Sequence, residues 1–181
     1  RIIEENLGGV GLFVNGACGD NHPKGAEAGF SRCETLGRTI SETALFHRWD
    51  AARISDHRMR SDYFDVELPA LSRAAFDRLP NNFDVQYSEP ELPGSHTGTV
   101  STRFSLWSIG PILFIGVPGE LCAELGMRLK WDSPFPKTYI MYMATDSVGY
   151  IAHPNAYGWG GYEVLTSSVG RDAGRILCEA I

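Results

Sequence analysis

The chain has 181 residues, enough for one domain that buries a sizeable core, and 43% of them are hydrophobic. Its formal net charge is −6 with acidic and basic residues interspersed, which argues against a nucleic-acid partner. No apolar run approaches the roughly 18 residues that a membrane-spanning helix needs, so we expect no transmembrane segment.

The first residues have the pattern of a helix end. Residues 1–9 finish in Gly8 and Gly9, either of which would serve as a C-terminal cap. The chain starts with Arg1 rather than Met, and a helix that ends this early indicates that more protein precedes it. We therefore expect residues 1–181 to be a fragment of a larger protein.

A loop of small residues at 15–23 follows a short apolar run at 10–14, which predicts a buried strand. The loop would bring backbone N–H groups and the side chains of Asp20, Asn21 and His22 to the end of that strand, where ligands commonly bind in α/β sheets. A tight turn shaped by Asp and Pro explains the same residues equally well.

The middle of the chain alternates between helical and strand patterns. In chain order, we predict a helix at 26–46 with one apolar face, followed by a strand at 52–68 that is clearest at 63–68. A short helix at 72–79, capped by Ser72, leads into a surface loop or lid at 80–98. Strands at 99–109 and 112–117 then form an antiparallel hairpin.

A second helical pattern begins at Glu120 and runs to about residue 130, with Leu121, Leu125 and Leu129 on one face. In the first turn of a helix, Glu120 would be stabilised by the dipole by roughly 0.3–1 kcal/mol, which explains it without any function. A strand at 138–144 and a final helix at 170–181 complete a mixed pattern. The predicted fold class is α+β or layered α/β, with mixed β-sheets flanked by helices.

Several polar side chains follow predicted strands or lie in turns. These candidates are Asp20, His22, Glu120, Asp146, Tyr150, His153 and Tyr162. Histidine and carboxylate groups from separate strand ends could bind a divalent metal or form an acid/base pair, and tyrosine could hold an oxyanion. The spacing does not choose among these, since the chain has no H-E-x-x-H, G-x-S-x-G, C-x-x-C or phosphate-loop motif.

An aromatic, glycine-rich loop near the end contains Tyr157 and Trp159. These side chains could form a rim that packs against an apolar or sugar-like ligand. They could equally pin the loop to the core.

Three stretches in order resemble one family. They are Asn-Gly-Ala-Cys-Gly-Asp-Asn-His-Pro at 15–23, Val-Pro-Gly-Glu-Leu at 117–121, and Gly-Tyr-Ile-Ala-His-Pro-Asn-Ala-Tyr-Gly-Trp-Gly-Gly-Tyr-Glu at 149–163. Together they look like the neutral/alkaline non-lysosomal ceramidases. The resemblance covers about residues 9–180, but only the C-terminal half of that family's catalytic domain. It implies a zinc-dependent amidase that cleaves the N-acyl bond of a sphingoid lipid, often secreted or membrane-associated, which suggests a secreted or periplasmic location.

The resemblance also assigns roles to residues of this chain. It implies that Glu120 and Tyr150 are zinc ligands and that Tyr162 lines the active site, while histidines of an upstream half complete the Zn2+ site. The family has an essential serine in its Gly-Asp-x-Ser-Pro loop, and His22 stands at the matching position here, next but one to Asp20. An imidazole could transfer protons or hold substrate, but it does not replace the serine hydroxyl directly.

The resulting prediction is a zinc-dependent hydrolase that uses metal-activated water on an amide bond, with a small-molecule or lipid-like substrate. Its predicted catalytic residues are His22, Tyr162 and Asp20, and its predicted substrate contacts are Tyr157 and Trp159. Two alternatives remain open: a catalytically inactive binding or structural homologue, and a hydrolase of another amide or ester.

Overall fold

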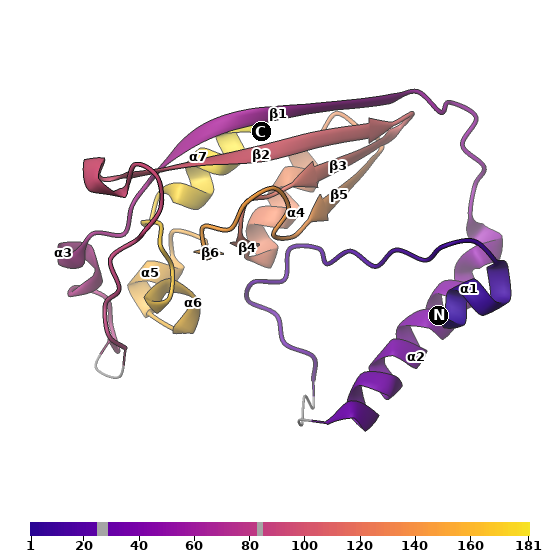
Figure 1. Ribbon diagram of the computed structural model, residues 1–181, viewed down its shortest axis with the longest axis horizontal. Coiled ribbons are helices and arrows are strands. Elements are labelled where there is room, and N and C mark those ends of the chain that lie inside the picture. The colour runs from indigo at the N-terminus through magenta and orange to yellow at the C-terminus, as the bar shows by residue number, and fades with distance from the viewer. Residues whose placement is uncertain (25–28, 83–84) are drawn as a thin grey trace. The chain divides into compact units, whose positions relative to one another are not determined.

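The computed structural model describes residues 1–24, 29–82 and 85–181 (Figure 1). These residues form two compact units. The first contains Arg1–Val14 and His22–Ser55, and the second contains Asn15–Asn21 and Asp56–Ile181.

The first unit is helical. It contains α1 (Ile2–Leu7), which ends at the predicted cap Gly8, then α2 (Phe30–Phe46) and a short 3-10 helix, η1 (His47–Asp50). The predicted helix is thus confirmed from residue 30, while residues 26–28 lie outside the described part of the chain. No residue of α2 is buried, so among the described residues its apolar side chains pack into no core.

The predicted buried strand at 10–14 is also wrong. The run forms no strand among the described residues, and its apolar side chains are exposed, with Leu12 88% accessible. A buried strand needs neighbours that pair its backbone N–H and C=O groups and cover its side chains. Local apolar content does not supply those neighbours.

The second unit is organised around a four-stranded sheet in the order β1-β2-β3-β5 (Figure 1). Its strands are β1 (Met59–Pro69), β2 (Thr99–Ile109), β3 (Ile112–Gly116) and β5 (Lys137–Met141). β1 and β3 both pair antiparallel with β2, which confirms the predicted hairpin, while β3 and β5 are parallel. The strand predicted at 52–68 begins only at Met59 and runs to Pro69, and the one predicted at 138–144 begins at Lys137 and ends at Met141.

Two helices pack with this sheet: α4 (Ala123–Asp132) with β5, and α7 (Ala173–Ala180) with β1. The main core lies here and includes buried side chains from both helices and from all four strands. The predicted apolar face of the second helical pattern is confirmed for Leu125 and Leu129, which are buried on α4. Leu121 is buried as well, but it precedes the helix.

The helix does not begin at Glu120, as the sequence pattern predicted. Glu120 and Leu121 form the short strand β4, which pairs in parallel with β6 (Tyr150–Ile151), and α4 starts at Ala123 after the N-cap residue Cys122. Pairing with a segment about thirty residues away overrides the local helical preference, which is weak over two residues. The helix dipole therefore does not account for Glu120.

Three one-turn helices surround a second apolar cluster: α3 (Arg73–Phe76), α5 (Ala156–Trp159) and α6 (Tyr162–Leu165). Ser72 caps α3 as predicted, accepting a hydrogen bond from the Ala75 backbone N–H at 3.2 Å. The long loop after α3 contains the 3-10 helix η2 (Ser95–Thr97), and Tyr87 fixes the loop by donating to the Leu71 carbonyl at 3.0 Å. Tyr87 also packs on Phe76, so this part of the loop belongs to the core.

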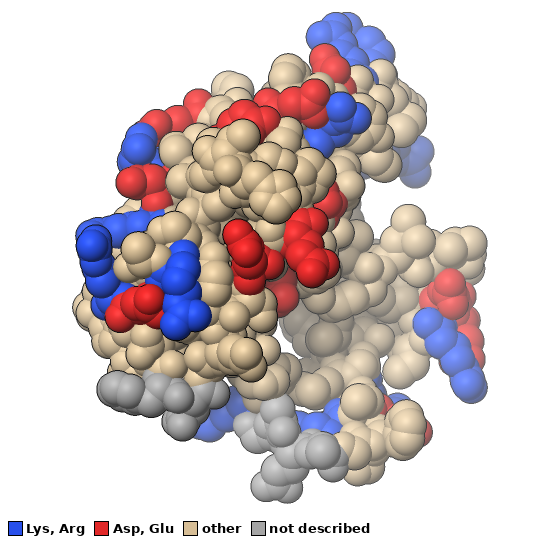
Figure 2. All heavy atoms as spheres, turned by 60° about the vertical axis from the view of Figure 1, so that its left-hand side comes forward, with Lys and Arg blue, Asp and Glu red and all other residues tan. Residues whose placement is uncertain are grey.

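Mixed sheets flanked by helices confirm the predicted α+β class. Among the described residues, no helix combines the length and apolar character that a membrane span requires. Figure 2 shows acidic and basic side chains interspersed over the face that it draws.

Candidate functional site

The parallel strands β3 and β5 end at one edge of the sheet, where Gly116 pairs with Met141. The chain leaves β3 through Val117 towards Glu120, and it leaves β5 directly into Tyr142. The two exits are joined by backbone hydrogen bonds from Val117 N to Met141 O at 3.0 Å and from Ala144 N to Val117 O at 2.9 Å. Polar side chains that follow two parallel strands therefore meet at this edge.

Glu120 lies directly opposite Tyr150 in the β4–β6 pair. The pairing is fixed by a bond from Glu120 N to Gly149 O at 2.8 Å and another from Cys122 N to Ile151 O at 3.1 Å. A Cβ atom at Gly119 would lie only 2.5 Å from Gly149 O, so the two backbones approach this closely because Gly119 has no side chain.

Two tyrosines interact with the Glu120 carboxylate, and a third packs against one of them. The Tyr142 hydroxyl donates a hydrogen bond to Glu120 Oε2. The Tyr150 phenol lies within hydrogen-bonding reach of the same carboxylate, and the Tyr162 ring contacts the Tyr150 ring edge-on, with centroids 5.7 Å apart. We call these four residues the Glu120 cluster. The structure thus brings together three residues that the sequence predicted and one, Tyr142, that it did not.

Partial burial and the Glu120 carboxylate keep the phenols of Tyr142 and Tyr150 protonated. Burial, followed by hydrogen bonding and the negative charge of Glu120, raises the pKa of Tyr150 to about 12. The same causes raise the pKa of Tyr142 well above its usual value. Burial and the charges of Glu120 and Asp20 also raise the pKa of the Cys18 thiol. At neutral pH, the Tyr142 and Tyr150 phenols are therefore neutral donors beside the Glu120 side chain.

The loop at residues 15–21 is fastened to the cluster's backbone. Gly19 N donates to Leu121 O at 2.9 Å, and Asp20 Oδ1 accepts from Ala123 N at 2.7 Å, at the start of α4. The side chain of Asp20, which was predicted to be catalytic, thus caps the N-terminus of α4. His22 is exposed and belongs to the first compact unit, so its catalytic role stays a prediction.

Two further sequence candidates lie apart from the cluster's hydrogen bonds. Asp146 accepts from Thr102 Oγ1 at 2.7 Å and from Ser147 N at 2.8 Å, which ties its turn to β2. His153 Nε2 lies 3.3 Å from Glu124 Oε1 on α4. Both contacts join neighbouring elements and explain these residues structurally.

The two aromatic residues predicted to form a substrate rim have different surroundings. Tyr157 is buried, with 8% of its surface accessible, and its hydroxyl donates to Val169 O at 2.7 Å. Trp159 is 74% accessible. Tyr157 therefore pins the loop to the core, and only Trp159 is available to an external ligand.

Replacing Tyr157 by Ala is expected to lower the free energy of unfolding by about 3–5 kcal/mol, because it empties a buried aromatic position. The matched change Trp159→Ala is expected to stay within about 0.5 kcal/mol, because that ring is exposed. Urea unfolding of both variants measures the difference. Equal losses of unfolding free energy in the two variants would contradict the assignment of Tyr157 to the core and of Trp159 to the surface.

The donor atoms of the Glu120 cluster fit part of a metal site. Glu120 and Tyr150 offer a carboxylate and a phenol oxygen from facing positions, and carboxylate oxygens are among the ligands that zinc accepts in proteins. Among residues 1–24, 29–82 and 85–181, no three His, Cys, Asp or Glu side chains are grouped so as to hold a metal ion. The described residues thus fit a metal site as two of its ligands, and such a site would need further ligands.

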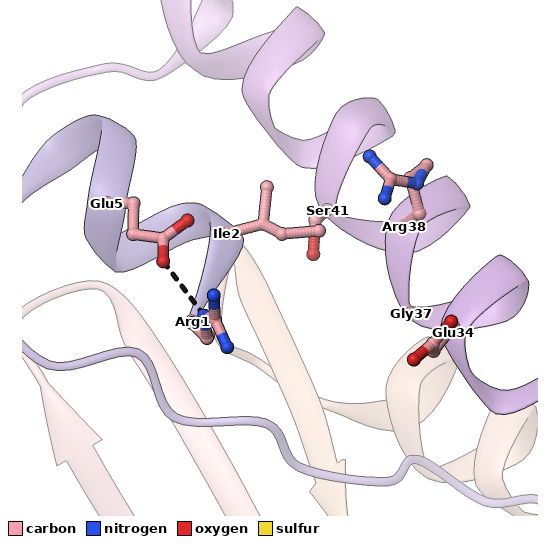
Figure 3. Close-up of a pocket in the computed structure, with 7 residues that line it drawn as sticks. All are labelled: Arg1, Ile2, Glu5, Glu34, Gly37, Arg38 and Ser41. Atoms are coloured by element: carbon pink, nitrogen blue, oxygen red, sulfur yellow. Dashed lines mark hydrogen bonds and ion pairs between the residues drawn. The ribbon is translucent and has the colours of Figure 1, made fainter. Parts of the chain in front are cut away.

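A separate groove of about 530 Å3 lies in the first unit between α1 and α2 (Figure 3). Acidic and basic side chains line it in equal number: Glu5 and Glu34, Arg1 and Arg38. Arg1 Nε donates to Glu5 at 2.8 Å across one turn of α1. The charges of these four side chains cancel, so the groove has no excess of either sign.

Comparison with protein-family models and with curated proteins finds no match. The solved structure of neutral ceramidase from Pseudomonas aeruginosa is similar, with a TM-score of 0.60 and 13% sequence identity over 96% of this chain and 36% of that chain. A structure of a ceramidase complexed with C2 matches with a TM-score of 0.40 and 15% identity over 45% of this chain and 14% of that chain. The first similarity shows a shared fold, and this chain spans about a third of the length of that neutral ceramidase.

Proposed function

We propose that this chain is part of a ceramidase-like, zinc-dependent hydrolase that cleaves an amide bond, with Glu120 and Tyr150 as two of its metal ligands. The observation that carries the proposal is the parallel β4–β6 pair, which sets these two oxygen-bearing side chains opposite each other. The fold shared with neutral ceramidase supports it.

The remaining ligands would be histidines outside this chain, since catalytic zinc sites usually have three protein ligands. Zinc, when bound, would supply a Lewis acid and lower the pKa of water so that it becomes nucleophilic near neutral pH. The cluster itself would hold charge: the Glu120 carboxylate would balance the cation, and the Tyr162 hydroxyl, beside Tyr150, would donate to a developing oxyanion. Trp159 offers an exposed apolar ring to a lipid-like substrate.

The test is zinc content by elemental analysis of the full-length protein that contains this sequence, followed by hydrolysis assays. We expect about one zinc per chain and cleavage of N-acyl substrates, as for a site of this class. Ceramide, short N-acyl amides and esters, assayed in parallel, would identify the substrate class. Tyr150→Phe, which removes one donor oxygen, should lower both zinc content and hydrolysis.

One observation favours a second candidate, a homologue that binds a ligand without catalysis. His22 stands where the resemblance places an essential serine hydroxyl. Zinc binding without cleavage of any substrate in the panel would support this candidate. Cleavage that survives in His22→Ala would show instead that the reaction needs neither group at this position.

A further inference from the structure

One residue of the Glu120 cluster lies outside every motif that pointed to the site. Tyr142 follows β5 and donates its hydroxyl to Glu120 Oε2. We propose that Tyr142 is a positioning residue that fixes the orientation of the Glu120 carboxylate, holding one oxygen and leaving the other to bind metal. Its link to metal rests on the proposed function, whereas the orientation of Glu120 is testable without metal.

The backbone around Tyr142 is braced against the segment that carries Glu120. Tyr142 N donates to Asn15 O at 3.0 Å, and Met143 N donates to Gly119 O at 3.3 Å, one residue before Glu120. Met143 and Thr145 adopt positive φ angles of 47° and 79°, which residues other than glycine rarely do. Such conformations persist only where the surrounding structure holds them, so the turn that begins at Tyr142 has a well-defined backbone and fixes the position of the Tyr142 side chain.

The two phenols at Glu120 are not equivalent, because they come from different elements. Tyr150 is the register partner of Glu120 on β6 and would turn towards a bound metal. Tyr142 comes from the sheet edge at β5 and would stay on the carboxylate. Carboxylates that ligate metals are usually held by such a hydrogen bond, and its loss typically costs 10–100-fold in metal affinity or activity.

The experiment compares Tyr142→Phe with Tyr139→Phe in the full-length protein. Both changes remove one phenol oxygen. Tyr139 lies on β5, and Tyr142 directly follows that strand. Tyr139 is a suitable control because it is 47% accessible and stacks on Phe114, with centroids 5.6 Å apart. Zinc affinity is measured by competition with a chromophoric chelator. In metal-free protein, a double-mutant cycle of Tyr142→Phe with Glu120→Ala measures their coupling through the unfolding equilibrium.

We expect Tyr142→Phe to weaken zinc binding by about 10–100-fold at unchanged saturating stoichiometry, and Tyr139→Phe to leave it unchanged. We expect the cycle to show coupling of about tenfold or more in the unfolding equilibrium constant, as for a hydrogen bond to a charged group. If the wild-type protein binds no zinc but the cycle shows coupling, the proposed function is wrong and the positioning of Glu120 by Tyr142 still holds. Absent coupling, or wild-type zinc affinity in Tyr142→Phe, would overturn the positioning role while leaving zinc binding in place.

Discussion

Glu120→Gln in the full-length protein is expected to weaken zinc binding by more than about 100-fold, beyond the loss typical of a residue that only supports a ligand. The amide keeps the size of the side chain and can still accept the Tyr142 hydrogen bond, but it lacks the negative charge that balances the cation. Hydrolysis should fall in parallel. Chelator competition and assays at saturating zinc measure the two losses separately.

The matched control is Glu124→Gln, four residues on, in the first turn of α4. This carboxylate is 68% accessible and contacts His153 instead of the tyrosines. Its loss should leave zinc binding unchanged. If Glu120→Gln retained the zinc content and hydrolysis of the wild type, Glu120 would not be a ligand and the proposed mechanism would be wrong.

Gly119→Ala is expected to lower the free energy of unfolding by about 1–3 kcal/mol and to disrupt the site as well. The added methyl group would lie 2.5 Å from Gly149 O and 3.1 Å from Ile151 Cδ1, so β4 must move away from β6. Such a shift separates Glu120 from Tyr150, which face each other across these two strands. Thermal unfolding reports the first effect and zinc affinity the second.

Gly158→Ala provides the control for this change, because a Cβ atom there meets nothing within 4 Å. It lies in the short helix α5, where alanine is preferred over glycine, so a neutral or slightly stabilising effect is expected. A Gly119→Ala variant as stable as Gly158→Ala, with unchanged zinc affinity, would contradict the close approach of β4 and β6.

The elements that the sequence predicted well are those whose pattern is local. The hairpin of β2 and β3 follows from alternating side chains on either side of Gly110, whose φ of 51° makes the turn. The buried face of α4 follows from Leu125 and Leu129 at helical spacing.

The features that sequence reasoning missed depend on partners far along the chain. Glu120 looked like the start of a helix because its pairing with Tyr150 leaves no trace in the neighbouring residues. Tyr142 looked like the interior of a strand, since the apolar run continues to Ala144, whereas β5 ends at Met141. The signal that could have found Tyr142 was the parallel pairing of β3 and β5, which places the residues after both strands at one edge.

The fastening of the loop at 15–21 to β4 and α4 has a consequence for the order of folding. The bond between Asp20 and Ala123 joins residues 103 positions apart, and Gly19 to Leu121 spans a similar distance. Closing so long a segment costs conformational entropy before any contact repays it, so the hairpin should form early and the Glu120 cluster late. Nascent chains would therefore acquire their sheet before they acquire the arrangement proposed to bind metal, and transient opening should begin at this fastening.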